Sequence, residues 1–230
     1  LTTCSLARHF MRLAVPAAIG MVFSTLYNVV DVFFAGMIGT DAQAGLAISF
    51  QAFFIFVTIG FGLSAAMTAL VGNAIGAKKT TDASIIAAQG IGFSIVTSVL
   101  LIFAARFIGP HLLAIISTEG AYRTAGEAYF MILILSLPGF IMGYGLNGIL
   151  QAQGDTVSMQ YALIGAFFAN IGLNPLMMFG IPGIWAGLGF DGIAAATVIS
   201  QTGVMLYIGV RLLRSGLLDA KTPNNILPDL

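Results

Sequence analysis

One carboxylate, Asp31, stands inside the long apolar run STLYNVVDVFFAGMIG, residues 24–39. Tyr27 lies four residues before it, Asn28 three and Ser24 seven, so a helix places all four polar side chains on one face. A charge at the centre of a membrane span costs about 2.5–3.5 kcal/mol on insertion scales, and an acid there normally faces protein or water. The pattern favours a site that binds a proton or a cation. A structural hydrogen-bond cluster is the alternative.

A second polar pair occurs in the apolar stretch ANIGLNPLMMFG, where Asn170 and Asn174 are four residues apart and share a helix face. Asn174 and Asp31 each lie about seven residues before the outer end of their predicted helices, so they are expected at the same depth. Pro175 cannot donate to a carbonyl one turn back, and neither can Pro16 in the first apolar run. Freed carbonyls suit a cation, and both prolines are candidate bending points, although membrane helices also tolerate proline without any such role.

The elements that carry these residues are membrane spans. Of 230 residues, 58% are hydrophobic and only 8% charged, and the mean hydropathy is +0.99, which predicts an integral membrane protein. Nine basic and nine acidic side chains balance, so no bulk charge indicates a nucleic-acid partner. Cys4 is the only cysteine, and no Cys/His spacing predicts a structural metal or a cofactor site.

Six apolar stretches are long enough to cross about 30 Å of hydrocarbon, and all are expected to be helices, because open strand edges are not satisfied in lipid. They make residues 1–214 a six-helix transmembrane domain, and the polar tail 215–230 is expected to be a cytoplasmic linker. Three G-x-x-x-G pairs, at Gly72, Gly139 and Gly183, predict close helix packing. The predicted spans are 12–38, 43–72, 84–107, 128–150, 159–181 and 192–213.

Lys and Arg give the orientation, because positive residues concentrate on the cytoplasmic side. Seven of the nine fall on one side of the predicted spans, which makes both termini cytoplasmic in a multi-pass protein of the plasma membrane: Arg8, Arg12, Lys78, Lys79, Arg211, Arg214 and Lys221. The segment from Arg106 to Glu127 is then expected to be an outer loop, with at most a short interfacial helix.

Several ordered motifs together resemble the amino-terminal lobe of the multidrug and toxic compound extrusion (MATE) transporters. They are LAVPAAIGMVFSTLYNVVDVFFAGMIGTDAQAGLAI, VGNAIGAKK, GLNGILQAQGDT, NIGLNPLMMFGIPG and GIAAATVIS, and they extend over essentially the whole chain. The resemblance implies an all-α fold, one six-helix lobe of a twelve-helix transporter whose second lobe is missing here. It also implies export of drug-like, often cationic, compounds in exchange for Na⁺ or H⁺.

The resemblance further implies roles for individual residues. Asp31 and Tyr27 match a helix-one pair of the family's cation site, Asn170 matches a helix-five ligand, and Thr197 is the corresponding helix-six Thr. Pro16 matches a proline at which helix one is proposed to bend. Asn174 departs from the pattern, since the most similar branch has a second Asp at this position. The amide oxygen of Asn174 still suits Na⁺. Two coupling ions therefore stay open: Na⁺ bound at Asp31 and Asn174, or H⁺ bound at Asp31.

Three other functions were weighed. A flippase for lipid-linked oligosaccharides shares the broader superfamily fold, but usually needs cationic groups in its cavity, and none of the nine Lys or Arg is clearly mid-membrane. An intramembrane protease needs Ser and His within hydrogen-bond reach, and His9 and His111 both lie outside the predicted spans. A channel would need a filter loop or a ring of charges, and neither is visible. Multidrug export is therefore the leading prediction, and the chain is not expected to be an enzyme.

Overall fold

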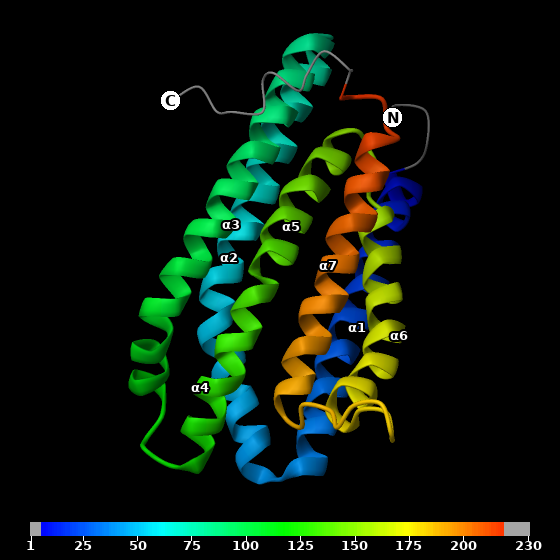
Figure 1. The fold of residues 1–230 in the computed structure, drawn as a ribbon. Helices are drawn as coiled ribbons and strands as arrows, with labels where there is room; N and C mark the ends of the chain where they lie inside the picture. The colour runs from blue at the N-terminus through cyan, green and yellow to red at the C-terminus, as the bar shows by residue number, and fades with distance from the viewer. Residues whose placement is uncertain (1–5, 219–230) are drawn as a thin grey trace.

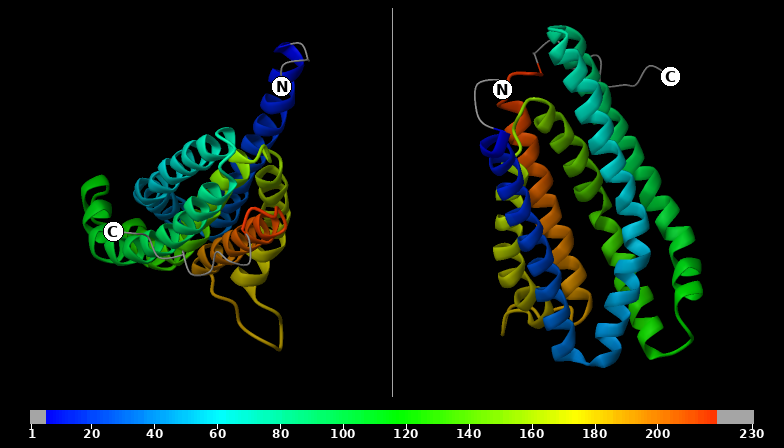
Figure 2. Two further views of the ribbon diagram at one scale, coloured as in Figure 1. Left: turned by 90° about the horizontal axis from the view of Figure 1, so that it is seen from above. Right: turned by 180° about the vertical axis from the view of Figure 1, so that it is seen from behind.

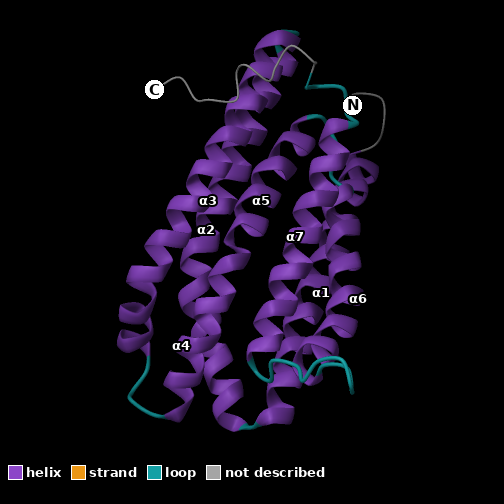
Figure 3. Ribbon diagram, in the orientation of Figure 1, coloured by secondary structure: helices purple, strands orange, loops and turns teal. Residues whose placement is uncertain are grey.

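The structure is a computed structural model that describes residues 6–218, with side chains described from residue 14 onward except at position 17. Most of the predicted linker 215–230, and the side chains of Arg8, Arg12 and Lys221, therefore lie outside the described residues. Within the described part, every regular element is a helix (Figure 3), apart from one isolated bridge between Ile181 and Trp185. The helices are α1 (Leu6–Ile38), α2 (Thr40–Gly76), α3 (Thr80–Ile116), α4 (Ala121–Leu133), η1 (Ile134–Ser136), α5 (Leu137–Ala152), α6 (Ser158–Phe179) and α7 (Asp191–Leu213).

Six of these units are long and apolar enough to cross a membrane, which confirms the predicted all-α class with six spans. The fourth span, Ala121–Ala152, consists of α4, a short 3₁₀ turn and α5. Pro138 explains this break, because it has no N–H to donate to the carbonyl of Ile134. Ser136 lies in the turn and donates its hydroxyl to the Leu133 carbonyl at 2.6 Å.

The prediction of an outer loop from Arg106 to Glu127 is wrong. Helix α3 continues to Ile116, and α4 begins at Ala121, so the connection consists of residues 117–120. The residues after Arg106, FIGPHLLAII, are almost all apolar and continue the helix, while the exposed Arg106 side chain extends from its surface. Pro110 does not end the helix.

The helices run up and down in sequence, so the start of α1 and the end of α7 lie at the same end of the bundle (Figure 1). They form two groups, in which α6 packs against α1 and α7, while α2 packs against α3, α4 and α5. Contacts of α7 with α4 and α5 join the groups, and Figure 2 (right) shows the two groups side by side. A cavity lies where these groups meet, and a buried acid, Asp31, lies inside the first group.

Glycines allow several close helix crossings, among them those of α5 with α7 and of α2 with α4. A Cβ on Gly139 of α5 would lie 2.8 Å from the backbone of Gln201 in α7, and one on Gly45 of α2 would lie 2.8 Å from the Tyr122 carbonyl oxygen in α4. By contrast, a Cβ on Gly143 would meet nothing within 4 Å. Of the G-x-x-x-G pair at Gly139 and Gly143, only the first glycine is therefore needed for packing.

Candidate functional site

Asp31 is completely buried between α1, α6 and α7, with 0% of the residue exposed. Its Oδ1 atom accepts a hydrogen bond from Asn170 Nδ2 at 3.0 Å and another from Asn174 Nδ2 at 2.8 Å. Asn174 Nδ2 also donates to Asn170 Oδ1 at 3.0 Å. Helices α1 and α6 run in the same direction, so the two amides and the carboxylate come to the same depth.

The other carboxylate oxygen faces α7. Thr197 Oγ1 donates to Asp31 Oδ2 across 3.4 Å, and the Tyr27 hydroxyl donates to Thr197 Oγ1 across 3.2 Å. Tyr27 and Thr197 are both buried. The five residues singled out in the sequence are thus joined in one buried hydrogen-bond network, and each oxygen of Asp31 is bonded to a different neighbouring helix.

The two candidate bending prolines lie inside continuous helices. Helix α1 runs through Pro16, and α6 runs through Pro175 to Phe179. Neither proline ends its helix, and Pro175 directly follows Asn174, so the backbone loses one donor immediately beside the network.

The network contains oxygen atoms that suit a small hard cation. Asn174 Oδ1 is buried and has no hydrogen-bond partner among the described residues, while its Nδ2 atom is occupied by Asp31 and Asn170. The other side-chain oxygens of the network are Asp31 Oδ1 and Oδ2, Asn170 Oδ1, Thr197 Oγ1 and the Tyr27 hydroxyl. Hard cations are bound by carboxylate, carbonyl and hydroxyl oxygens, and an unpartnered buried oxygen calls for an explanation of this kind.

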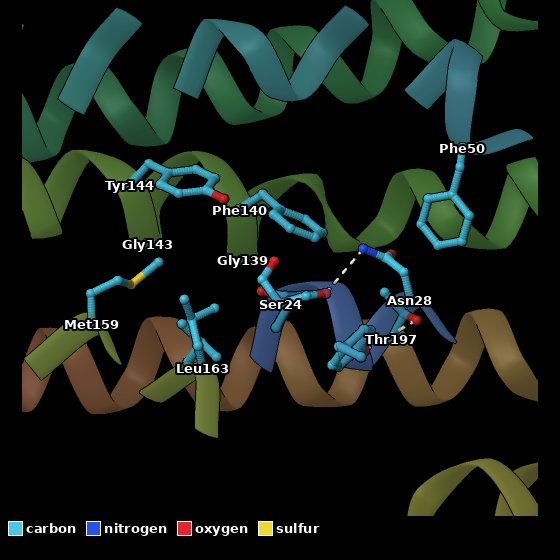
Figure 4. A pocket seen from close by; sticks show the side chains of 13 residues that line it. Ser24, Asn28, Phe50, Gly139, Phe140, Gly143, Tyr144, Met159, Leu163 and Thr197 are labelled. Carbon is cyan, nitrogen blue, oxygen red and sulfur yellow. Dashed lines mark hydrogen bonds between the residues drawn. The ribbon is translucent and has the colours of Figure 1, made fainter. Parts of the chain in front are cut away.

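A cavity of about 70 Å³ adjoins the network, where the two helix groups meet (Figure 4). Its wall includes two members of the network, Thr197, which bonds to Asp31, and Tyr27, which bonds to Thr197. The wall combines aromatic, aliphatic and neutral polar side chains and has no charged residue: Ser24, Tyr27, Asn28, Phe50, Gly139, Phe140, Gly143, Tyr144, Met159, Leu163, Thr197, Gln201 and Val204. A neighbouring pocket of about 390 Å³ shares Ser24, Tyr144, Met159 and Leu163 with it.

Sequence reasoning missed Tyr129. Its side chain is fully buried, its ring stacks on Phe190 at 4.8 Å, and its hydroxyl has no partner among the described residues. Nothing in the sequence separates this tyrosine from the other aromatic residues of the spans.

A polar cluster at the opposite end of α6 was also missed. Asp155 Oδ1 accepts hydrogen bonds from the backbone N–H groups of Val157 and Ser158, at 3.2 and 3.0 Å, and Arg211 Nη2 of α7 donates to Asp155 Oδ2 at 3.0 Å. Partial burial would raise the pKa of Asp155, but the hydrogen bonds from Ser158, Arg211 and Val157 outweigh it and hold that pKa below its usual value. An Asp three residues before the first apolar turn of a helix is a capping pattern that could have revealed part of this cluster.

Comparison with known proteins gives a consistent result. The MatE family model matches residues 16–176. The chain is 26% identical over 209 residues to "Probable multidrug resistance protein YoeA" of Bacillus subtilis, covering 90% of this chain and 45% of that protein. It is 25% identical over 226 residues to the "FAD transporter" of Shewanella oneidensis, covering 95% and 50%.

Among solved structures, an outward-facing multidrug resistance MATE family transporter of the MOP superfamily superimposes with a TM-score of 0.83 at 23% identity. That match covers 96% of this chain and 48% of the transporter. The chain therefore spans about half the length of the relatives it matches, as expected for one lobe.

The fold and the site define a six-helix membrane unit with a buried acid network beside an uncharged cavity. Of the two relatives named above, one is called a multidrug resistance protein and the other a transporter. The chain belongs to the MatE family.

Proposed function

We propose that this chain is the amino-terminal lobe of a secondary active exporter of drug-like, often cationic, compounds, driven by Na⁺ or H⁺ that binds at Asp31. The observation that carries the proposal is the buried Asp31 carboxylate, which accepts hydrogen bonds from two other helices. One of its donors, Thr197, also lines the cavity. A buried acid in a membrane span is expected to have a function of this kind.

Cation binding at Asp31 would change the interactions that join three helices. Asn170, Asn174 and Thr197 all donate hydrogen bonds to the Asp31 carboxylate, an arrangement that suits its ionised form. A proton on Asp31 turns one acceptor oxygen into a donor, and Na⁺ competes with the amide and hydroxyl protons for the same oxygens. Either ion therefore favours a different arrangement of α1 against α6 and α7, and differential binding shifts the population of conformations.

The same change reaches the cavity through Tyr27 and Thr197, because both residues belong to the network and to the cavity wall. Their hydroxyls would reorient when Asp31 binds a cation. We therefore expect the affinity for cargo to depend on the ion at Asp31, as exchange requires.

The uncharged cavity wall favours neutral or cationic cargo with aromatic surface. Phe50, Phe140 and Tyr144 supply ring faces that attract cations, and Met159 adapts to varied apolar shapes. A diphosphate, as in FAD or a lipid-linked oligosaccharide, would find no positive side chain on this wall. Multidrug export is thus favoured over both of these alternatives for this lobe.

The orientation follows from positive residues. Lys78, Lys79, Arg211 and Arg214 lie at the end of the bundle where α1 begins and α7 ends (Figure 1). By the positive-inside rule this end faces the cytoplasm of a plasma-membrane protein.

The test uses the transporter with its second lobe, reconstituted in vesicles, and follows efflux of a fluorescent cationic dye under separate Na⁺ and H⁺ gradients. Asp31→Asn is compared with Asp41→Asn, which makes the same chemical change at an exposed residue near the outer end of α2. We expect gradient-driven efflux to be lost only in Asp31→Asn, and the gradient that drives the wild type identifies the ion. Undiminished efflux in a folded Asp31→Asn protein would refute the proposal.

A further inference from the structure

The connection between α6 and α7, residues 180–190, has an unusual composition for a loop. Its sequence, GIPGIWAGLGF, contains no charged residue. Large apolar side chains on it are nevertheless exposed: Ile184 is 77% exposed, Leu188 48% and Ile181 39%. An ordinary solvated connector would be expected to carry polar side chains, so this loop requires another environment.

Backbone hydrogen bonds hold the loop in a regular conformation. Ile181 and Trp185 exchange two backbone hydrogen bonds, at 3.0 and 3.1 Å, and the N–H groups of Leu188 and Gly189 donate to the last turn of α6. Gly180 and Gly187 have φ of +74° and +75° and lie so close together that a Cβ on either would overlap the other's backbone. The sequence therefore fixes a backbone that holds the apolar side chains outward.

The loop also projects sideways. Seen along the bundle, it extends beyond the helices (Figure 2, left) at the end opposite the start of α1 (Figure 1). The loop directly follows α6, which also has exposed apolar side chains, among them Phe168 and Phe179. Because α6 is one of the six membrane spans, that surface of α6 is suited to lipid.

We propose that residues 180–190 form a membrane anchor, which lies in the headgroup and upper acyl region of the bilayer at this end of the bundle. Ile184 and Leu188 contact acyl chains, and Trp185 lies at the level of the headgroups, where an amphipathic indole ring is most favourable. The partner is the lipid surface, because the loop directly follows a membrane span with exposed apolar side chains and carries no charge between Gly180 and Phe190.

Trp185 is the only tryptophan among the 230 residues, so its fluorescence reports on this loop directly. The complete protein is reconstituted in phosphatidylcholine vesicles, with any tryptophan outside these residues replaced by phenylalanine. Quenching by lipids brominated near the carbonyl end or near the methyl end of the acyl chain is compared with quenching by aqueous iodide. We expect stronger loss of fluorescence with the shallow bromines than with the deep ones, and less loss with iodide than for a free tryptophan amide.

Two other outcomes would overturn the proposal. Free quenching by iodide without quenching by bromolipid would mean that the loop stands in water, and protection from both would mean that protein covers it, either the second lobe or another copy. The double variant Ile184→Glu with Leu188→Glu should lower bromolipid quenching and raise iodide quenching, whereas Ile184→Val with Leu188→Val should change neither. Circular dichroism checks that the variants keep their helices. If they do not fold, the quenching of the wild-type protein alone still tests the proposal.

Discussion

The crossing of α5 and α7 at Gly139 yields a prediction with a matched control one turn away. In Gly139→Ala the new Cβ lies 2.8 Å from the Gln201 backbone, while an ordinary contact needs at least about 3.4 Å. The two helices must therefore separate by roughly half an ångström. In Gly143→Ala the methyl group meets nothing within 4 Å. Both glycines line the same cavity and lie in the same helix.

The expected difference in stability follows from these distances. Replacing Gly by Ala within a helix gains up to about 1 kcal/mol of helix propensity, and this gain applies to both variants. Overpacking a tight contact costs about 1–3 kcal/mol, and it applies only to Gly139→Ala. The two variants should therefore differ by about 1–3 kcal/mol, or roughly 2–12 °C in melting temperature for a chain of this size.

The assay is thermal unfolding of both variants and the wild type in the same detergent. Gly143→Ala should unfold at or above the wild-type temperature, and Gly139→Ala below it. Equal melting temperatures for the two variants would refute the reasoning that a backbone contact at Gly139 sets this helix crossing. Because Thr197 lies one turn before Gln201, we also expect Gly139→Ala to weaken transport more than Gly143→Ala.

Three further predictions concern polar side chains. Asn174→Ala should destabilise the protein by about 1–3 kcal/mol in thermal unfolding, because Asp31 loses a donor in a buried setting; an unchanged melting temperature would contradict this network. Tyr129→Phe should leave the melting temperature equal or higher, because its hydroxyl has no partner among the described residues, and a marked decrease would reveal a bound water or ion. The pKa of Asp155 is lowered in the folded state, so its stabilising contribution is present above the unfolded pKa of about 4 and is lost as pH falls through the folded pKa. The difference in melting temperature between wild type and Asp155→Asn should accordingly be constant near neutral pH and shrink below about pH 4, and a difference independent of pH would exclude this role.

The sequence was most informative about the number of membrane spans, which depends on the length of the apolar stretches. The sequence predicts six spans because lipid requires long apolar helices, and the described residues form six helices long and apolar enough to cross a membrane. The predicted third span ends too early, at residue 107, because Arg106 is taken as the membrane boundary. Ten mostly apolar residues follow Arg106 and continue the helix to Ile116. A long side chain on a helix surface can reach the interface without ending the helix, so one charge is weak evidence for a boundary.

Contacts between helices were only partly predictable. Helical spacing put Asn170 and Asn174 on one face, and equal depth suggested that Asp31 lies near them, but the hydroxyl contacts of Thr197 with Asp31 and Tyr27 depend on how α7 packs. Likewise, Asp155 and Arg211 are 56 residues apart, and their ion pair depends on the antiparallel pairing of α6 and α7. The glycine motif had the same limitation, since only the three-dimensional crossing distinguishes Gly139 from Gly143.

If Asp31 exchanges ions as proposed, the connections of α6 and α7 indicate which helix would move. At one end Asp155 and Ser158 bond to Arg211, and at the other the N–H of Leu188 donates to Met177 at 2.8 Å. Helices α6 and α7 are therefore joined at both ends, with Asn170, Asn174 and Thr197 between those ends.

Helix α1 meets this pair differently. In the second half of α1, the hydrogen bonds that its described side chains make with the pair are those of Asp31 and Tyr27, and an aromatic contact joins Phe23 to Phe167 at 5.3 Å. A cation that weakens the bonds to Asp31 would thus loosen α1 from a pair that stays together. We infer that α1 is the moving element, and that a disulfide placed between α6 and α7 should leave efflux intact while one between α1 and α6 should stop it.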